Sequence, residues 1–599
     1  MRFVTAAMGA AAFSLALLGG AARAPQPSVV PARPAAAAHR AAPSTTRPDA
    51  PAPEKPAPAA DSALVVSLAN SSFYFIRYDH WSPADERGFG EFVRRIGESR
   101  CATVNSCLHG PGNPFRASDP ASIRFKADCA DFPYLLRAYY AWKRALPFSY
   151  ESAVAARGYT RDIRYTARGN RVVERREVLS GSVTGYGLLE TLRDTISSAA
   201  YRIHPDLDAP LPPDQYSPAI TPQSIHAGTL IYDPNGHLAT IYRVDPDGRI
   251  FYIDAHPDQS VTRGNYDMRF VRARPSMGAG FKNWRPERLV GATRRADGVL
   301  MGGHIELARN KDIADFSDVQ FFGTGPRPSD DSQWASGRFV LNGEPVNYYD
   351  YVRGMLAGGK LRFNPLKEVG DMIASNCSDL HYRAEAVAVA IEAGIQNLSE
   401  PHRLPPNIFG TEGVWEVYST PSRDARLKTA FKELRDQTQR FVEMYRRGDP
   451  KLVYKGKDLV GDLLRLYDAK TAACKISYTR SDGSRVTLGY EEARRRLFAM
   501  SFDPYQCVEH RWGARTPGEL ATCKDGATKR AWYAAEQNLR NQIDRTYGAR
   551  MDFTLAELQS PGPGRGVPAP PDTDVRAYLM AMRGARAGVS APADTASVR

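Results

Sequence analysis

The segment HAGTLIYDPNGHLATIYRVDPDGRIFYIDAHP, residues 226–257, contains three runs rich in β-branched and aromatic residues. Asp-Pro-Asn-Gly at 233–236 and Asp-Pro-Asp-Gly at 245–248 separate these runs. Asp, Pro, Asn and Gly are the residues that tight turns favour. Two such turns between three β-rich runs predict a three-stranded antiparallel meander.

The second turn also predicts which residues of the meander face one another. If two residues form the tip of this turn, Val244 lies opposite Arg249. Continuing that register places His237 opposite His256, with Asp254 as the diagonal neighbour of His237 on the same face. A β-bulge would shift the register by one residue and move these side chains to the other face.

A second segment, ADCADFPYLL at residues 127–136, begins a predicted helix that runs to about Leu146. Asp128 is a typical N-cap residue, and apolar residues recur at helical spacing behind it. Cys129 then lies at the N-terminus of a buried helix, where the macrodipole and the free amides favour the thiolate. Because Asp128 and Asp131 oppose that effect, the thiol needs a separate base to become nucleophilic.

The chain contains seven cysteines, so full pairing within the chain leaves one thiol over in an oxidising compartment. Six cysteines permit fifteen connectivities. Two pairs are close enough in the sequence to close small loops, and the remaining two cysteines would then pair with each other. The favoured pairs are Cys101–Cys107, Cys507–Cys523 and Cys377–Cys474. Cys129 is the residue left over, and it is either a reactive thiol or a buried structural residue.

The N-terminus carries the features of an exported protein. Arg2 precedes an apolar run that ends in small residues at 19–22, as in secretory signal peptides. An uncleaved membrane anchor is the alternative, because the apolar stretch nearly reaches spanning length. Residues 25–61 are almost wholly Pro, Ala, Ser and Arg, which is typical of a disordered linker. We therefore expect a signal peptide at 1–24, a linker at 25–61, and a secreted or periplasmic mature protein without a stable membrane span.

The remaining sequence suggests two folded parts and a tail. Helical periodicity dominates the C-terminal half, with patterns at 384–395, 423–446, 457–473, 490–500 and 527–545. We expect an α+β domain at 62–300, a mixed connecting region at 301–370 and a helical domain at 371–559. Residues 560–599 are expected to form a Pro/Gly-rich, largely disordered tail with one short helix. The sequence leaves the oligomeric state open.

Charge and motifs exclude several functional classes. The net charge is +13, which favours weak attraction to acidic polymers. However, no Lys/Arg run interleaved with aromatic residues marks a nucleic-acid surface. The sequence has no His-x-x-x-His or Cys-x-x-Cys spacing, and no phosphate-binding glycine loop after a strand. We therefore expect neither a nucleic-acid partner nor a bound metal or other cofactor.

Three motifs together resemble the papain-like superfamily, especially its transglutaminase-like branch and its NlpC-type cell-wall endopeptidase branch. They are Asp-Cys-Ala-Asp-Phe at a helix start, Gly-His-Leu-Ala-Thr-Ile-Tyr on a strand, and Ile-Asp at the end of the next strand. The resemblance covers residues 110–260 and implies a papain-like domain of a helix packed on an antiparallel sheet. It also implies a catalytic triad in which Cys129 is the nucleophile, His237 the general base and Asp254 the orienting residue.

Two points of the implied site stay open. NlpC-type members use a polar residue, often His, in the third position, which keeps His256 as the alternative to Asp254. Beyond the backbone N–H of Cys129, no donor for an oxyanion hole can be identified in the sequence.

The resemblance implies an exported thiol-dependent hydrolase or acyltransferase that acts on an amide bond. Its expected substrates are peptides or proteins of the cell envelope, peptidoglycan peptides among them. Water as the acceptor makes the enzyme a peptidase or amidase, and an amine makes it a transpeptidase. The alternative is a non-catalytic, papain-like envelope protein used for binding or scaffolding, which has no need for a free thiol at Cys129.

Overall fold

The computed structural model describes residues 72–270, 272–408, 410, 413–418, 421–544, 549–560 and 562–587. The expected signal peptide at 1–24 and linker at 25–61 lie outside these residues. Within the described ranges, no helix has both the length and the apolar character that crossing a bilayer requires.

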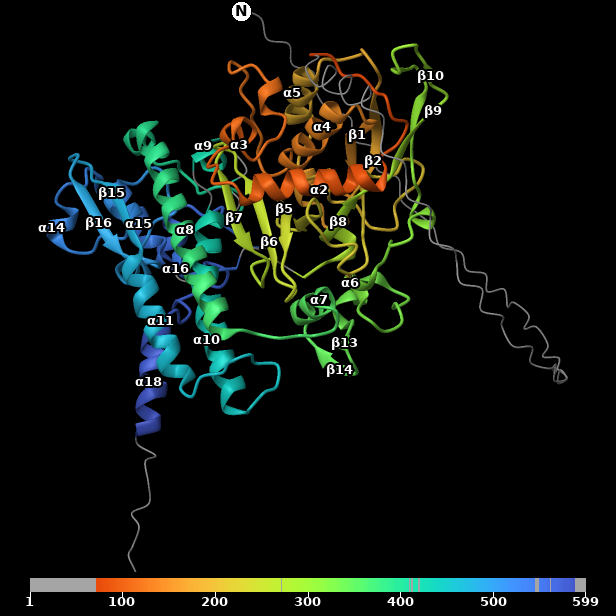
Figure 1. Cartoon of the computed structure of the whole chain (residues 1–599). Helices are drawn as coiled ribbons and strands as arrows, with labels where there is room; N and C mark the ends of the chain where they lie inside the picture. Colours follow the sequence, from red (N-terminus) through yellow and green to blue (C-terminus); the bar gives the residue numbers. More distant parts are fainter. Residues whose placement is uncertain are drawn as a thin grey trace, which may run out of the picture. The chain divides into compact units, whose positions relative to one another are not determined.

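The N-terminal half is built on a six-stranded antiparallel sheet with the strand order β3-β8-β4-β5-β6-β7 (Figure 1). Its strands β4, β5 and β6 follow one another in the chain and are neighbours in the sheet, which confirms the predicted meander. The six strands are β3 (Gln215–Tyr216), β4 (Leu230–Asp233), β5 (His237–Val244), β6 (Ile250–Ala255), β7 (Val261–Asn265) and β8 (Gly280–Trp284).

The turn between β5 and β6 differs from the prediction. Val244 pairs with Ile250 and not with Arg249, because the tip of the turn has three residues and not two. The Asp245 N–H closes the turn by donating to the Arg249 carbonyl oxygen at 2.9 Å. Gly248 takes the left-handed conformation, with φ of 79°, that three-residue hairpin loops require.

A β-bulge then restores the predicted register. Tyr242 has no partner in β6, because the pairing shifts by one residue between Ile241 and Arg243. Beyond the bulge Thr240 faces Ile253, which is the pairing that a two-residue turn would have produced. The two offsets cancel, so the ends of β5 and β6 that carry the candidate site residues keep the expected alignment.

Apolar side chains on the two faces of the sheet belong to different cores. One face contributes Tyr232, Leu238 and Ile253 to a core shared with helices α2 (Pro83–Glu98), α4 (Phe132–Arg144) and α5 (Gly185–Thr195). Figure 1 shows α2 running across β5, which it contacts. The other face packs Ile231 and Ile241 against α6 (Val319–Phe322) and α7 (Tyr348–Leu356).

Within the described residues, the N-terminal half also contains short two-stranded sheets and one further α-helix. The strand β1 (Phe148–Ala156) pairs with β2 (Asn170–Val178) through an irregular register at residues 151–154. The other pairs are β9 (Glu287–Val290) with β12 (His304–Leu307), β10 (Thr293–Arg294) with β11 (Leu300–Met301), and β13 (Phe339–Leu341) with β14 (Glu344–Val346). The further helix is α3 (Val104–His109).

The C-terminal part is mostly helical, as predicted. Three long helices surround one core: α8 (Pro365–Glu392), α10 (Pro421–Arg446) and α11 (Leu459–Ala473). A β-hairpin that the sequence did not predict packs into the same core. The hairpin consists of β15 (Lys475–Thr479) and β16 (Arg485–Gly489). The shorter helices are α9 (Gly413–Tyr418), α12 (Tyr490–Arg496), α13 (Val508–Arg511), α14 (Pro517–Leu520), α15 (Ala527–Ala535), α16 (Gln537–Asn541) and α17 (Leu555–Gln559).

The short helix expected within the Pro/Gly-rich tail is α18 (Val575–Ala587). Val575 and Leu579 on this helix are fully buried in the core of α8, α10 and α11. Hydrophobic burial therefore fixes this part of the chain, although the composition around it is rich in Pro and Gly.

The structure contains the two disulfides that proximity in the sequence favoured and the third that joins the remaining pair. Their Cα–Cα distances are 4.9 Å for Cys101–Cys107, 6.1 Å for Cys377–Cys474 and 5.6 Å for Cys507–Cys523. Three disulfides in one chain favour an oxidising compartment outside the cytoplasm.

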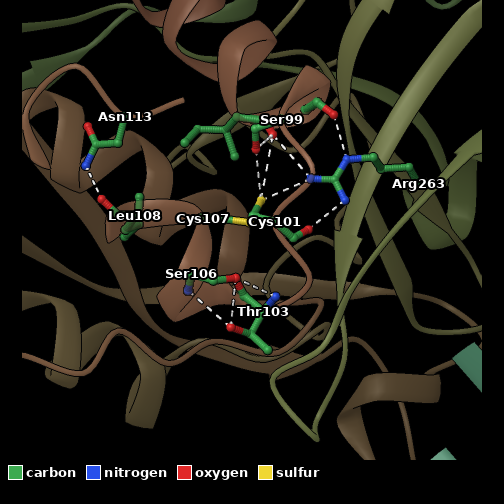
Figure 2. The surroundings of a disulfide bond; sticks show 10 residues. Ser99, Cys101, Thr103, Ser106, Cys107, Leu108, Asn113 and Arg263 are labelled. Atoms are coloured by element: carbon green, nitrogen blue, oxygen red, sulfur yellow. Dashed lines mark hydrogen bonds between the residues drawn. A yellow bond between two sulfur atoms is a disulfide. The ribbon is translucent and has the colours of Figure 1, made fainter. Parts of the chain in front are cut away.

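The Cys101–Cys107 disulfide anchors the segment that leads to Cys129 (Figure 2). The guanidinium of Arg263 on β7 donates to the Cys101 carbonyl oxygen at 2.9 Å and to its sulfur at 3.0 Å. Further along, the Ala127 N–H donates to the Gln259 side chain at 2.8 Å. These contacts fix the residues before Cys129 to the edge of the sheet.

Candidate functional site

Cys129 lies in a turn before helix α4, and the predicted helix start is therefore wrong. The helix begins at Phe132, with Asp131 as its N-cap residue. Asp128 instead caps the turn that carries Cys129: its carboxylate accepts the Ala130 N–H at 2.7 Å and the Asp131 N–H at 3.4 Å, and its carbonyl oxygen accepts the Phe132 N–H at 3.1 Å. This turn presents the thiol three residues before the first helical residue.

The thiol of Cys129 is the free cysteine of the chain and is partly exposed. Its S–H donates to the carbonyl oxygen of Gly236 at 3.9 Å, just before β5. Burial and then the nearby Asp128 raise the pKa of the Cys129 thiol, although the Leu238 N–H acts in the opposite direction. The helix start was expected to favour the thiolate, but burial and Asp128 outweigh that effect. The free protein therefore holds a neutral thiol.

The partly exposed His237 and the buried Asp254 form a pair across strands β5 and β6. The Nε2 atom of His237 lies 2.6 Å from Oδ2 of Asp254. Thr262 on β7 donates its hydroxyl to the other carboxylate oxygen, Oδ1. Because the carboxylate accepts the proton of Nε2, the neutral imidazole has its lone pair on Nδ1. His237 is therefore held in the tautomer that a general base acting through Nδ1 needs.

Charges around the pair keep the imidazole neutral and the carboxylate ionised. Burial and the positive charge of Arg426 lower the pKa of His237, while Asp254 acts in the opposite direction. Burial by itself would raise the pKa of Asp254. His256, His237 and Arg426 outweigh it and hold this pKa well below its ordinary value. At neutral pH the pair is thus in the state that accepts a proton.

His256, the alternative third residue, is placed differently. Its Nε2 lies 2.9 Å from the Thr262 hydroxyl and 3.9 Å from Oδ2 of Asp254. Its ring stacks on Tyr382 of α8 at a centroid distance of 4.7 Å. Burial lowers the pKa of His256 to about 3. Asp254, and not His256, therefore contacts His237 directly. His256 contacts Thr262, which in turn donates to Asp254.

Cys129 and His237 line the same cavity, which has a volume of about 170 Å³. Asn235 in the turn before β5 and His256 directly after β6 also line it. The amide nitrogen Nδ2 of Asn235 is buried, and the described part of the chain provides no acceptor for it. The sequence analysis did not select Asn235 as a site residue. Its place in the turn two residues before His237 was the signal that could have identified it.

The helical C-terminal part supplies the opposite wall of this cavity. Ser422, Arg423 and Arg426 of α10 line it, and so does Glu416 of α9. Arg426 reaches Asp254 directly, with its Nη1 atom 3.4 Å from Oδ2. Sequence reasoning missed these residues because their periodicity predicts a helix but does not identify its partner.

Three other groups of side chains bring metal-ligating atoms within 4.8 Å of one another in the described residues. In two of them the cysteines form disulfides, so their thiolates are not available as ligands. In the third, Arg327 already pairs with both carboxylates. We assign no metal to these groups, which are Cys507/His510/Cys523/Asp525, Cys377/His381/Cys474 and His204/Asp206/Asp331.

No protein-family model matches the chain, and searches of curated proteins and of solved structures found no match either.

Proposed function

We propose that the protein is an exported, thiol-dependent hydrolase or acyltransferase that acts on an amide bond through Cys129, His237 and Asp254. One observation carries this proposal: the His237–Asp254 pair, joined at 2.6 Å, opens into the same cavity as the free thiol. A nucleophile, a base and a residue that orients the base are the parts that this chemistry requires.

We infer the following mechanism from the residues that line this cavity, in which the thiol leaves the Gly236 carbonyl oxygen for His237. Nδ1 of His237 takes the proton of the Cys129 thiol, and the sulfur attacks the carbonyl carbon of the substrate amide. Asp254 stabilises the imidazolium that forms, which then protonates the leaving amine. Water or a second amine resolves the thioester. Because burial raises the pKa of the thiol and lowers that of His237, proton transfer accompanies the attack and does not precede it.

Two donors are available for the oxyanion of the tetrahedral intermediate. One is the backbone N–H of Cys129, as the sequence suggested. The other is the side-chain amide of Asn235, which lines the cavity and whose buried nitrogen has no acceptor among the described residues. Removing one donor of this kind typically lowers kcat by about 10²-fold or more.

The fold and the disulfides support a papain-like enzyme of the cell envelope. The described residues pack helix α4, which follows the thiol, on the antiparallel sheet that carries His237 and Asp254. Three disulfides suit a secreted or periplasmic location. We propose envelope peptides or proteins as substrates, with peptidoglycan peptides as the first to test.

A non-catalytic binding protein is the second candidate. The raised pKa of the Cys129 thiol favours it, because an inert thiol needs no activation. In that case Asp254, Thr262 and Arg426 form a buried polar network that only stabilises the contact between the sheet and α10.

Labelling with iodoacetamide distinguishes the two candidates. The non-reduced protein is treated between about pH 4 and about pH 9, and mass mapping identifies the modified residue. For an enzyme we expect selective labelling of Cys129, reduced in His237→Ala and unchanged in the control variant His226→Ala, whose histidine is exposed. A Cys129 that stays inert over the whole range would rule out the catalytic role and favour the binding protein.

A further inference from the structure

A second, smaller cavity lies beside the cavity of Cys129, between the sheet and the helical part. Its volume is about 40 Å³, and His256, Arg423 and Arg426 line both cavities. Residues of β6 and β7 line one side of it, and residues of α8 and α10 line the other. Because arginines dominate the lining, we call this cavity the arginine pocket. The arginines are Arg263, Arg269, Arg383, Arg423 and Arg426, and the acidic residues of the lining are Asp379 and Asp424.

Arg383 of α8 brings a donor without an acceptor to the arginine pocket. Only 3% of this residue is exposed. Its Nε and Nη2 atoms each donate to the carboxylate of Asp424 at 2.9 Å. The remaining nitrogen, Nη1, is buried and has no acceptor among the described residues. Because a guanidinium only donates, the missing partner of Nη1 must be an acceptor.

Arg263 of β7 adds a positive charge without a direct counter-charge. Its guanidinium donates to the backbone carbonyl oxygens of Gly97 at 2.6 Å and of Cys101 at 2.9 Å. Within the described part of the chain, no carboxylate lies at ion-pairing distance from it. Burial lowers the pKa of Arg263, as expected for a cation that no carboxylate pairs with.

The two aspartates of the lining are already engaged. Asp424 accepts both bonds from Arg383, and Asp379 lies 3.6 Å from Nη1 of Arg269. A water molecule would satisfy Nη1 of Arg383 but leave the positive charge of the pocket in place. An anion supplies both an acceptor and a negative charge. The cavity exceeds the roughly 10–15 Å³ that one water molecule needs, so a small ion fits into it.

We propose that the arginine pocket binds a small anion, either a halide such as chloride or a carboxylate group. Guanidiniums are weakly hydrated and always charged, which suits them to hold an anion at a buried site. The binding does not depend on the proposed thiol chemistry. Arg426 nevertheless connects the two sites, because its Nη1 lies 3.4 Å from Asp254. A bound anion would offset part of the charge that Arg426 places beside the His237–Asp254 pair.

Thermal unfolding of the full secreted chain tests the proposal. The Tm is measured in sodium gluconate, sodium chloride and sodium acetate at the same ionic strength and pH. Gluconate is too large for the pocket, so it reports the general effect of salt. The variants are Arg423→Gln and Arg263→Gln, and both are expected to fold because the two arginines are partly exposed. The control is Arg446→Gln, at an exposed position on α10 outside the pocket.

We expect chloride or acetate to raise the Tm of the wild type and of the control by about 2 °C above the value in gluconate. Both variants should lose most of this shift. A shift with chloride alone identifies a free halide as the ligand, a shift with acetate alone identifies a carboxylate group, and a shift with both identifies a site for either. Two results would overturn the proposal. One is a wild type whose Tm is the same in all three salts, and the other is a full shift retained in both variants.

Discussion

At the scale of single residues, the site depends on a charge balance around Asp254. This carboxylate is fully buried, and it accepts from His237 and Thr262 while Arg426 lies at 3.4 Å. An unpaired buried carboxylate would be strongly unfavourable, so these partners keep it ionised. The same partners determine which nitrogen of His237 carries the proton.

The substitution Asp254→Asn tests the role of this carboxylate. The amide keeps the volume but removes the charge that stabilises the imidazolium, so kcat should fall by up to about 10⁴-fold. Steady-state kinetics on a peptide amide measures the loss, and circular dichroism checks the fold. Cys129 should still be alkylated by iodoacetamide. A variant that turns over substrate like the wild type would show that Asp254 has no part in catalysis.

The pH profile of kcat/KM tests the influence of Arg426. Burial and Arg426 lower the pKa of His237 from its ordinary value of about 6.5. The acid limb of the profile, where the imidazole becomes protonated, should therefore lie below about pH 6.5. The substitution Arg426→Gln removes the positive charge and allows the pKa of His237 to rise. The acid limb should therefore move to higher pH.

The control for this experiment is Arg446→Gln, because Arg446 is an exposed residue at the end of the same helix. An acid limb that stays in place in Arg426→Gln would separate Arg426 from the titration of His237. An acid limb that moves equally in both variants would indicate a general effect of net charge and not a local one.

At the scale of elements, the sequence predicted the meander but not its details. Turn residues and β-branched runs identified β4, β5 and β6, because this chemistry is local. The three-residue turn and the bulge at Tyr242 were not predicted, since both depend on the packing of the sheet. The candidate pair His237–Asp254 was still found, because the two offsets cancel before the strands reach it.

The turn between β5 and β6 depends on Gly248, which suggests a stability test. A Cβ atom there would lie 2.0 Å from the carbonyl oxygen of Arg353 on α7, and φ is 79°. Gly291→Ala is a matched control, because φ is 73° but nothing lies within 4 Å of the added Cβ. We expect Gly291→Ala to lower the free energy of unfolding by about 1–2 kcal/mol, which is the cost of the left-handed conformation.

Gly248→Ala should lower the free energy of unfolding by more than the control does, because the backbone of α7 must also move. Urea unfolding of both variants measures the difference. Equal losses would mean that the turn and α7 separate without cost, which would contradict the close packing between them.

At the scale of the whole molecule, the helical part contributes to the candidate site. Arg426 and Asp254 are 172 positions apart, yet they contact each other. A sequence reveals such a contact poorly, because the apolar stripe of α10 predicts a buried face but not what covers it. The prediction that the C-terminal part is helical was confirmed. The contribution of α10 to the cavity could be found only from the structure.

The Cys377–Cys474 disulfide tests how much this helical part depends on a covalent link. It closes a loop with a sequence separation of 97, whereas Cys101–Cys107 closes one of only 6. A cross-link stabilises mainly by restricting the unfolded chain, and the effect grows with loop length. Replacing both cysteines of the long loop with serine should lower the free energy of unfolding by about 2–5 kcal/mol. The double serine variant of the short loop should lose less.

Urea unfolding of the two double variants measures these losses, and labelling of Cys129 in each follows the site. If α8 and α11 hold the wall of the cavity in place, removing Cys377–Cys474 should also increase the alkylation of Cys129, because the wall formed by α10 then opens more often. A loss of stability without any change in alkylation would mean that the site on the sheet keeps its structure when the helices loosen.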